Sequence, residues 1–186
     1  AEAGIRPEVR HLANSAAAIL RPSVRFDLVR VGLASYGLDP APGRTPDLGL
    51  RPAMTVQATL ALSKPLAAGA SVSYGHTWTA DVATTVGLVP VGYGDGVPRH
   101  ASNTGEVQIG GKRRAIRGRV CMDQFVVDLG GDLPPAGERV VLFGDGRHGE
   151  PTAQEWAEAA DTISYEIVTR IGGRMTRRYV EGVPGS

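Results

Sequence analysis

Proline and glycine divide the chain into two parts between Asp39 and Pro52. This segment reads DPAPGRTPDLGLRP and holds four prolines and two glycines in fourteen residues. Proline lacks the backbone N–H that helices and strands use, and glycine adds conformational freedom, so the segment favours an irregular connection between folded parts. We therefore expect one domain in residues 1–45 and another in residues 46–186.

Short strands separated by turn residues are the pattern after this boundary. Apolar and polar residues alternate in Ala53–Ser63, as in a half-buried strand, and the later apolar runs end at glycine or proline. The other runs that we predict as strands are Ser71–Tyr74, Thr84–Val91, three runs within Gly105–Leu129 with a hairpin turn at Gly110–Gly111, Arg139–Phe143 and Arg174–Val180. This spacing predicts a mainly β domain, a small β-barrel or sandwich.

One or two helices accompany these strands. Pro151–Ala160 is amphipathic, with Thr152 as the expected N-cap and Glu155 three residues later, which is the pattern of a capping box. Thr162–Ile171 is a shorter apolar segment that we also predict as helical. The last residues, Glu181–Ser186, are expected to form a frayed tail.

A strand that runs into a helix is predicted for Val9–Leu20. Asn14 and Ser15 supply cap chemistry, and the free N–H groups at such a helix start can bind phosphate, although most serine caps only cap. Phe26–Leu38 is a second apolar strand, interrupted by Arg30. An arginine there either faces water on an edge strand or donates to a ligand in a cavity, because burying it unpaired is very costly.

Two tyrosines are each followed directly by glycine, at Tyr74–Gly75 and Tyr93–Gly94. A glycine lets the backbone turn sharply at a strand end and leaves the phenol at a rim, where it can serve in acid–base chemistry. The alternative is a pair of buried aromatic side chains at strand ends. Asp95 and Asp123 are predicted as turn residues, and no spacing of histidine, cysteine and acidic residues suggests a metal site.

Charge and cysteine content narrow the class of protein. The net charge is +1, with basic and acidic residues interspersed, which argues against nucleic acid or an anionic membrane as the main partner. Cys121 is the only cysteine, so no internal disulfide can form, as suits a reducing compartment. There is no apolar run of about 18 residues for a membrane helix, and the first ten residues lack the pattern of a signal peptide. We expect a cytoplasmic protein.

Three blocks together resemble a known family. SVSYGHTWTA, VPVGYGDGVPR and GRVCMDQFVVDLG occur in this order and closely resemble the C-terminal half of bacterial alanine racemases, over His11 to about Tyr179. The resemblance implies interconversion of L- and D-alanine with pyridoxal 5′-phosphate, supplying D-alanine for the cell wall. It also implies a (β/α)8 barrel followed by a β domain, and a head-to-tail homodimer with shared active sites. Residues 1–45 would then be the last, incomplete strand and helix units of the barrel, since a whole barrel needs about 250 residues.

The resemblance also assigns roles to individual residues. Tyr74 matches the catalytic tyrosine, the base or acid on the L-alanine side of the α-carbon, opposite a barrel lysine that also binds the cofactor covalently. Met122 matches a backbone contact to the substrate carboxylate. The residues that match the holders of the cofactor phosphate are Ser15, Gly32, Leu33 and Tyr165, with Gly32 and Leu33 acting through backbone N–H groups.

Arg30 matches the residue that faces the pyridine nitrogen of the cofactor. A permanently protonated guanidinium cannot accept a proton from that nitrogen, which weakens the ring as an electron sink and favours racemisation over transamination. Residues at the substrate entrance match Tyr93, Arg99 and Arg119; the alternative for both arginines is surface charge that supports the sheet. His11 and His76 lie beside matched residues and are not assigned to catalysis.

The family's cofactor lysine has no counterpart in these residues. The chain has two lysines, Lys64 and Lys112, and neither lies in the matching motif. We therefore expect this chain alone to be inactive and to belong to a longer or split racemase. Two alternatives stay open: a related racemase of broader amino-acid specificity, and a non-catalytic interaction module that binds a barrel partner.

Overall fold

The computed structural model describes residue 4 and residues 6–180. They form two compact units, which divide between Thr55 and Val56. The division lies in an irregular stretch, residues 37–55, and the boundary expected from the sequence lies in the same stretch. Glu181–Ser186, expected as a tail, lie outside the described residues. No helix in the described part of the chain is long and apolar enough to cross a membrane.

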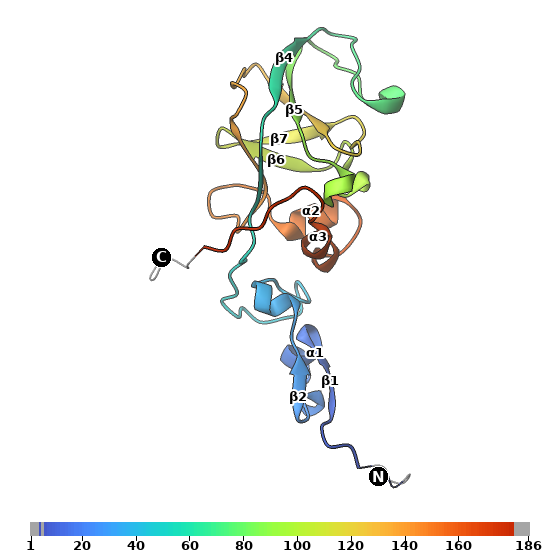
Figure 1. The fold of residues 1–186 in the computed structure, drawn as a ribbon, viewed down its shortest axis with the longest axis vertical. Coiled ribbons are helices and arrows are strands. Elements are labelled where there is room, and N and C mark those ends of the chain that lie inside the picture. Colours follow the sequence, from blue (N-terminus) through green and yellow to red (C-terminus); the bar gives the residue numbers. More distant parts are fainter. Residues whose placement is uncertain (1–3, 5, 181–186) are drawn as a thin grey trace. The chain divides into compact units, whose positions relative to one another are not determined.

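The first unit is built on one strand–helix–strand motif (Figure 1). β1 (His11–Asn14) leads directly into α1 (Ser15–Leu20), the short 3-10 helix η1 (Pro22–Val24) follows, and β2 (Leu28–Arg30) lies parallel to β1. Asn14 caps α1, because its side chain accepts a hydrogen bond from the Ala17 N–H at 3.0 Å. The predicted strand running into a helix is therefore confirmed, and parallel strands joined by a helix are the repeating motif of α/β barrels.

The sequence suggested one continuous strand over Phe26–Leu38, and this prediction is wrong. Only Leu28–Arg30 pairs with β1, and Leu33–Tyr36 forms the 3-10 helix η2. The chain turns between them because the N–H groups of Gly32 and Ala34 donate to the hydroxyl of Ser15, at 3.1 and 3.3 Å, instead of to a neighbouring strand. Ser15 lies seventeen or more positions away, so the local apolar pattern does not reveal this contact.

The second unit is a single curled antiparallel sheet with two helices (Figure 1). Its seven strands lie in the order β3-β9-β6-β7-β8-β5-β4, and every neighbouring pair is antiparallel. The strands are β3 (Val56–Thr59), β4 (Leu62–Leu66), β5 (Thr84–Val89), β6 (Glu106–Ile109), β7 (Lys112–Arg117), β8 (Phe125–Gly130) and β9 (Arg139–Phe143). The predicted mainly β fold with two helices is confirmed.

The sheet closes through one continuous segment, residues 56–66. Its first half, β3, pairs with β9, and its second half, β4, pairs with β5. At the crossing, the Leu60 N–H donates to the Glu138 carbonyl and the Ala61 N–H to the Leu88 carbonyl, both at 2.8 Å. Both ends of the strand order thus meet on the same segment, which makes the sheet a small barrel rather than a flat sheet with two free edges.

Alternating side chains of these strands fill the interior. In β8 the side chains of Phe125, Val127 and Leu129 are buried while their neighbours are not, as the period of a strand requires. The predicted hairpin turn is confirmed at Gly110–Gly111, where both residues have positive φ and join β6 to β7.

The helix α2 (Ala153–Ala159) covers part of this barrel and contacts α3 (Ser164–Arg170). Thr152 and Glu155 form the predicted capping box: each side chain accepts a hydrogen bond from the other's backbone N–H. The indole of Trp156 is buried, and its N–H donates to the Leu142 carbonyl of β9 at 2.6 Å. This bond attaches α2 to β9, the strand that precedes it in the chain.

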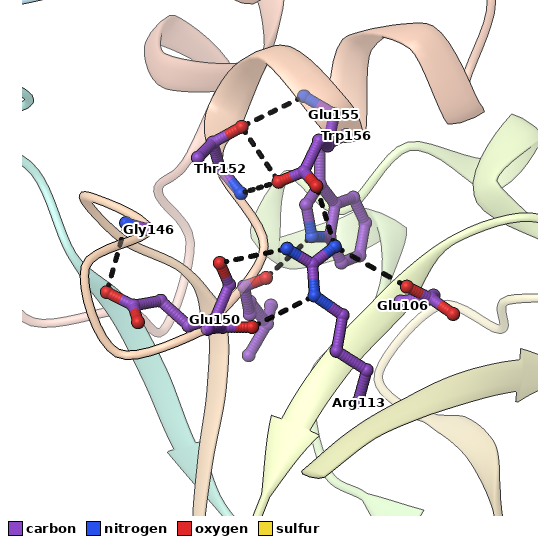
Figure 2. Close-up of polar contacts among 9 residues, drawn as sticks. Glu106, Arg113, Gly146, Glu150, Thr152, Glu155 and Trp156 are labelled. Carbon is purple, nitrogen blue, oxygen red and sulfur yellow. Dashed lines mark hydrogen bonds and ion pairs between the residues drawn. The ribbon is translucent and has the colours of Figure 1, made fainter. Parts of the chain in front are cut away.

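A guanidinium joins α2 to the β6–β7 hairpin (Figure 2). Arg113 Nη1 lies 2.7 Å from a carboxylate oxygen of Glu155 and 3.5 Å from one of Glu106, and its Nε donates to the Gly149 carbonyl at 2.9 Å. We call these four residues, Arg113, Glu106, Glu155 and Gly149, the Arg113 clasp. The clasp joins a hairpin, a loop and a helix and contains no predicted site residue.

Two of the predicted strands are absent. Ser71–Tyr74 makes one isolated bridge, from Ser71 to Thr79, and the 3-10 helix η3 begins at Tyr74, because the Ser73 hydroxyl turns inward to the Arg119 carbonyl. The described stretch Arg174–Val180 has no strand. Arg174 is held there by side-chain hydrogen bonds to Asp95 and not by backbone pairing with a neighbouring strand. The run Thr84–Val91 forms a strand only as far as Val89, because Pro90 has no N–H to donate.

Candidate active site

Tyr74 lies at the surface of the second unit, at the start of η3 (Tyr74–His76), and its side chain is 73% exposed. The residue before it is fixed: the Ser73 hydroxyl donates to the Arg119 carbonyl at 2.6 Å. Ser73 has φ 64° and ψ 179°, a conformation that residues other than glycine rarely adopt. The phenol is therefore presented outward on a held turn, and it is not one of the buried aromatics that the alternative interpretation required.

Arg119 and Asn103 hold the same turn from its other side. A Cβ built on Gly75 would lie 3.2 Å from the central carbon of the Arg119 guanidinium, so that side chain lies against the residue that follows Tyr74. The Asn103 side chain accepts a hydrogen bond from the Gly118 N–H at 2.6 Å and donates to the Thr77 hydroxyl at 3.2 Å. Asn103 carried no recognisable signal in the sequence.

Met122 and Tyr93 lie together on two segments that cross closely. The Tyr93 N–H donates to the Cys121 carbonyl at 2.9 Å, and the Gly94 N–H donates to the Met122 carbonyl at 2.8 Å. Gly92 permits this approach, since a Cβ there would lie 2.2 Å from the Cys121 carbonyl oxygen. Met122 is 62% exposed, and its own N–H has no acceptor among residues 6–180, so it is free to donate to a ligand.

Residues 118–122 are thus the shared support of the predicted site in this unit. Arg119 contacts the Tyr74 turn, and Cys121 and Met122 pair with the Tyr93 segment, η4 (Tyr93–Asp95). Together with the segments that they hold, these residues present exposed phenols, the Arg119 guanidinium and the free N–H of Met122. Such a set can bind a carboxylate and transfer a proton.

Asp95 lies under this support and is 3% exposed. Two hydrogen bonds from the Arg174 guanidinium, at 3.0 Å and 2.7 Å, hold the pKa of its carboxyl below the ordinary value, although burial acts to raise it. The sequence predicted Asp95 as a turn residue. Its turn is confirmed, since it ends η4, but its ion pair with Arg174 was not foreseen.

Arg99 and Tyr165 are the other predicted site residues of the second unit. Arg99 begins η5 (Arg99–Ala101), where its carbonyl accepts a hydrogen bond from the Ser102 hydroxyl, and its side chain is exposed. Tyr165 lies in α3 and is half-buried. No hydrogen bond in the described part of the chain connects either side chain to the support at residues 118–122.

Ser15, Gly32 and Leu33 come together in the first unit. The Ser15 side chain is 2% exposed, and its oxygen accepts the Gly32 and Ala34 N–H groups, so its own O–H remains to be donated. The Leu33 N–H has no acceptor within the described residues, and a Cβ built on Gly32 would meet nothing within 4 Å. The sequence suggested that Asn14 and Ser15 both supply cap groups for α1, but only Asn14 does. Ser15 instead holds the turn at Gly32, where its own O–H and the Leu33 N–H remain free to donate.

Arg30 pairs with His11 across the two parallel strands, with 2.8 Å between Arg30 Nη1 and His11 Nδ1. Because a guanidinium can only donate, His11 Nδ1 is the acceptor of this hydrogen bond. Both side chains are exposed within this unit, and the pairing of Arg30 with His11 was not predicted from the sequence. Among the described residues, no group of three or more His, Cys, Asp or Glu side chains could hold a metal ion.

Comparison with known families assigns both units. Residues 53–179 match the family described as "Alanine racemase, C-terminal domain", and residues 1–40 match "Alanine racemase, N-terminal domain". The chain belongs to the alanine racemase family.

Individual alanine racemases are similar over nearly the whole chain. That of Streptomyces coelicolor is 59% identical over 179 residues, which are 95% of this chain and 46% of that protein. That of Thermobifida fusca is 59% identical over 182 residues, 98% of this chain and 48% of that protein. The solved structure from Streptomyces coelicolor superposes with a TM-score of 0.92 at 57% identity, covering 97% of this chain and 48% of that chain. The chain thus spans about half the length of these alanine racemases.

Alanine racemases are isomerases that depend on pyridoxal phosphate. The donor set of the first unit fits the phosphate of that cofactor: a buried serine O–H and an unpaired backbone N–H face open space at Gly32. Anions are bound in proteins by donors of this kind. The exposed Arg30 guanidinium is a fixed cation that suits the ring nitrogen.

Proposed function

We propose that this chain supplies part of the active site of a pyridoxal-phosphate-dependent alanine racemase, with Tyr74 as the acid–base group on the L-alanine side. The observation that carries this proposal is the exposed phenol of Tyr74 on a turn held by Ser73 and Arg119. The Ser73 hydroxyl also lies 3.4 Å from the sulfur of Cys121, the residue before Met122 with its free N–H. Racemisation needs a proton to leave the α-carbon on one face and to return on the other. A phenol that is held at its backbone and open at its hydroxyl suits one of these two steps.

Substrate recognition in this proposal comes from backbone and entrance residues. The Met122 N–H donates to the alanine carboxylate, in an orientation fixed by the Cys121 carbonyl of the same peptide group, which accepts a hydrogen bond from the Tyr93 N–H. Tyr93, Arg99 and Arg119 line the entrance, where the two guanidinium groups attract the carboxylate. The second base is neither Lys64, which lies in β4, nor Lys112, whose amine pairs with Asp132 at 2.8 Å.

Cofactor binding is proposed for both units. Ser15, through its O–H, and Gly32 and Leu33, through their backbone, would hold the phosphate together with Tyr165, and Arg30 would face the ring nitrogen. When bound, pyridoxal phosphate withdraws electrons from the substrate and so acidifies the α-proton. Arg30 donates and cannot accept, so it leaves the ring nitrogen without a proton, and His11 holds the guanidinium in place.

The remaining parts of the proposal concern the whole protein. Residues 1–45 are the end of a cofactor-binding barrel and residues 46–186 a β domain, in a head-to-tail homodimer that shares its active sites. The protein works in the cytoplasm and supplies D-alanine for peptidoglycan. The exposed apolar side chains of β1 and β2, which include Leu12, Leu28 and Val29, support a barrel around this motif, because water-exposed parallel strands are rare.

The test uses a composite racemase, in which this chain replaces the matching half of the Streptomyces coelicolor relative. The composite should bind pyridoxal phosphate and racemise alanine, with serine and lysine as comparison substrates. Tyr74→Phe should lower turnover of L-alanine by about 10²- to 10⁴-fold, the usual contribution of a general acid or base. Exchange of the α-proton of D-alanine with solvent deuterium should survive, because it uses the other base.

Tyr179→Phe is the matched control, since that tyrosine is 91% exposed in the second unit and is not assigned to the site. It should leave both the turnover of L-alanine and the α-proton exchange of D-alanine unchanged. Equal loss of L-alanine turnover and D-alanine exchange in Tyr74→Phe would mean that Tyr74 is structural. A composite that binds the cofactor but racemises nothing would refute the proposed function.

A further inference from the structure

The Asp95–Arg174 ion pair is built as a complete fork. Arg174 Nε donates to one carboxylate oxygen of Asp95 at 3.0 Å and Nη2 donates to the other at 2.7 Å. Glycine at 173 allows the two segments to come this close, because a Cβ there would lie 2.6 Å from the Gly94 carbonyl oxygen. The Gly172 N–H adds a backbone bond to the Asp95 carbonyl at 3.1 Å.

The pair also fixes backbone groups on either side of the predicted substrate-binding residues. The second oxygen of Asp95 accepts the Gly92 N–H at 3.0 Å. Arg174 Nη2 reaches the Pro90 carbonyl at 3.1 Å and the Asp123 carbonyl at 3.2 Å. Gly92 directly precedes Tyr93, and Asp123 directly follows Met122.

The orientation of the Met122 N–H depends on these contacts. The Met122 N–H belongs to the same planar peptide group as the Cys121 carbonyl, which accepts a hydrogen bond from the Tyr93 N–H at 2.9 Å. The next two peptide groups are held at the Met122 carbonyl by the Gly94 N–H and at the Asp123 carbonyl by Arg174. The adjoining peptide groups are therefore restrained, so the free N–H points in one direction. A donor that is held in place before the ligand arrives loses less entropy on binding it.

We infer that Asp95 and Arg174 are positioning residues for substrate binding: together they fix Tyr93 and the Met122 N–H in the geometry that receives the alanine carboxylate. This inference rests on the proposed function. The Asp95 side chain is 3% exposed but that of Arg174 is 60% exposed, and an ion pair with one partner largely in water is weak evidence for a role in stability. Its contacts concentrate instead on the two segments that carry the substrate-binding groups.

The experiment places Arg174→Gln, Arg174→Lys and Asp95→Asn in the composite racemase. Each should raise KM for alanine by about tenfold, the effect of losing one well-oriented hydrogen bond to a charged ligand, with kcat changed by much less. Arg174→Lys keeps the charge but not the fork, so it should recover only part of the loss.

Arg113→Gln is the matched control, because the Arg113 clasp also joins three segments but holds no substrate-binding group. It should lower the thermal unfolding temperature and leave KM unchanged. A second measurement needs neither cofactor nor substrate: amide hydrogen exchange in the 186-residue chain. Arg174→Gln should speed exchange at Tyr93 and Gly94, which Arg113→Gln should not.

Two outcomes distinguish this inference from the proposed function. Lower thermal stability in Arg174→Gln with unchanged KM and unchanged exchange at Tyr93 and Gly94 would overturn this inference and leave the proposed function standing. If Arg174→Gln does not fold, Arg174→Lys and Asp95→Asn carry the same test. An unsubstituted composite that binds cofactor without racemising alanine would refute the proposed function, and this inference with it.

Discussion

Ser73 gives the sharpest test of the turn that presents Tyr74. Its φ of 64° and ψ of 179° lie in a region that is nearly restricted to glycine, and such strain costs about 1–3 kcal/mol. The hydroxyl bond to the Arg119 carbonyl, at 2.6 Å, partly offsets that cost and contributes about 1 kcal/mol; the same oxygen also lies 3.4 Å from the Cys121 sulfur. The two substitutions Ser73→Ala and Ser73→Gly separate these effects.

Ser73→Ala removes the bond and keeps the strain, so it should lower the free energy of unfolding by about 1 kcal/mol. Ser73→Gly also removes the bond but releases the strain of about 1–3 kcal/mol. Glycine loses more conformational entropy on folding than alanine, which offsets this gain by about 0.5–1 kcal/mol. Ser73→Gly should therefore be more stable than Ser73→Ala by about 1 kcal/mol. At an ordinary strand position, by contrast, the alanine variant would be the more stable of the two.

Urea unfolding followed by tryptophan fluorescence measures this difference in the 186-residue chain. Trp78 and Trp156 are its only tryptophans, and both lie in the second unit, so the signal reports that unit alone. The comparison uses midpoints at equal slope. If Ser73→Ala proves the more stable of the two, Ser73 is not strained and the argument for a held turn loses its basis.

Two further predictions concern the first unit and the lysines. Hydrogen bonds from the Arg10 side chain and backbone lower the pKa of Asp27 from 3.8 to about 2, so the stability that this pair contributes is present above pH 3.8 and is lost as the pH falls to about 2. Carboxyl NMR titration should show this value. Arg10→Gln should raise it only part of the way to 3.8, because the backbone N–H of residue 10 still donates to the carboxylate. Incubation of the 186-residue chain with pyridoxal phosphate and borohydride should leave no stoichiometric label on Lys64 or Lys112, as peptide mass spectrometry can test, because Lys64 lies in β4, which carries no proposed cofactor-binding residue, and the amine of Lys112 pairs with Asp132. Stoichiometric label on either lysine would contradict the proposed assignment of the second base.

Local chemistry was enough to predict the elements that depend on near neighbours. The capping box of Thr152 and Glu155, the N-cap Asn14 and the hairpin at Gly110–Gly111 each involve residues no more than three positions apart. Their hydrogen bonds and turn preferences are set within a few residues of sequence. The outward placement of Tyr74 was also one of the alternatives that its Tyr–Gly pair suggested.

Tertiary structure decided the features that depend on contacts between distant segments. Ser73 leaves a strand conformation for a carbonyl 46 residues away, Gly32 turns toward a serine 17 residues earlier, and Asp95 pairs with an arginine 79 residues later. Closure of the sheet likewise depends on one segment pairing at both ends. The sequence therefore determined which chemical groups the chain carries and its local turns and caps. The fold alone determined which groups meet, because a hydrogen bond between distant residues forms only after packing has brought them together.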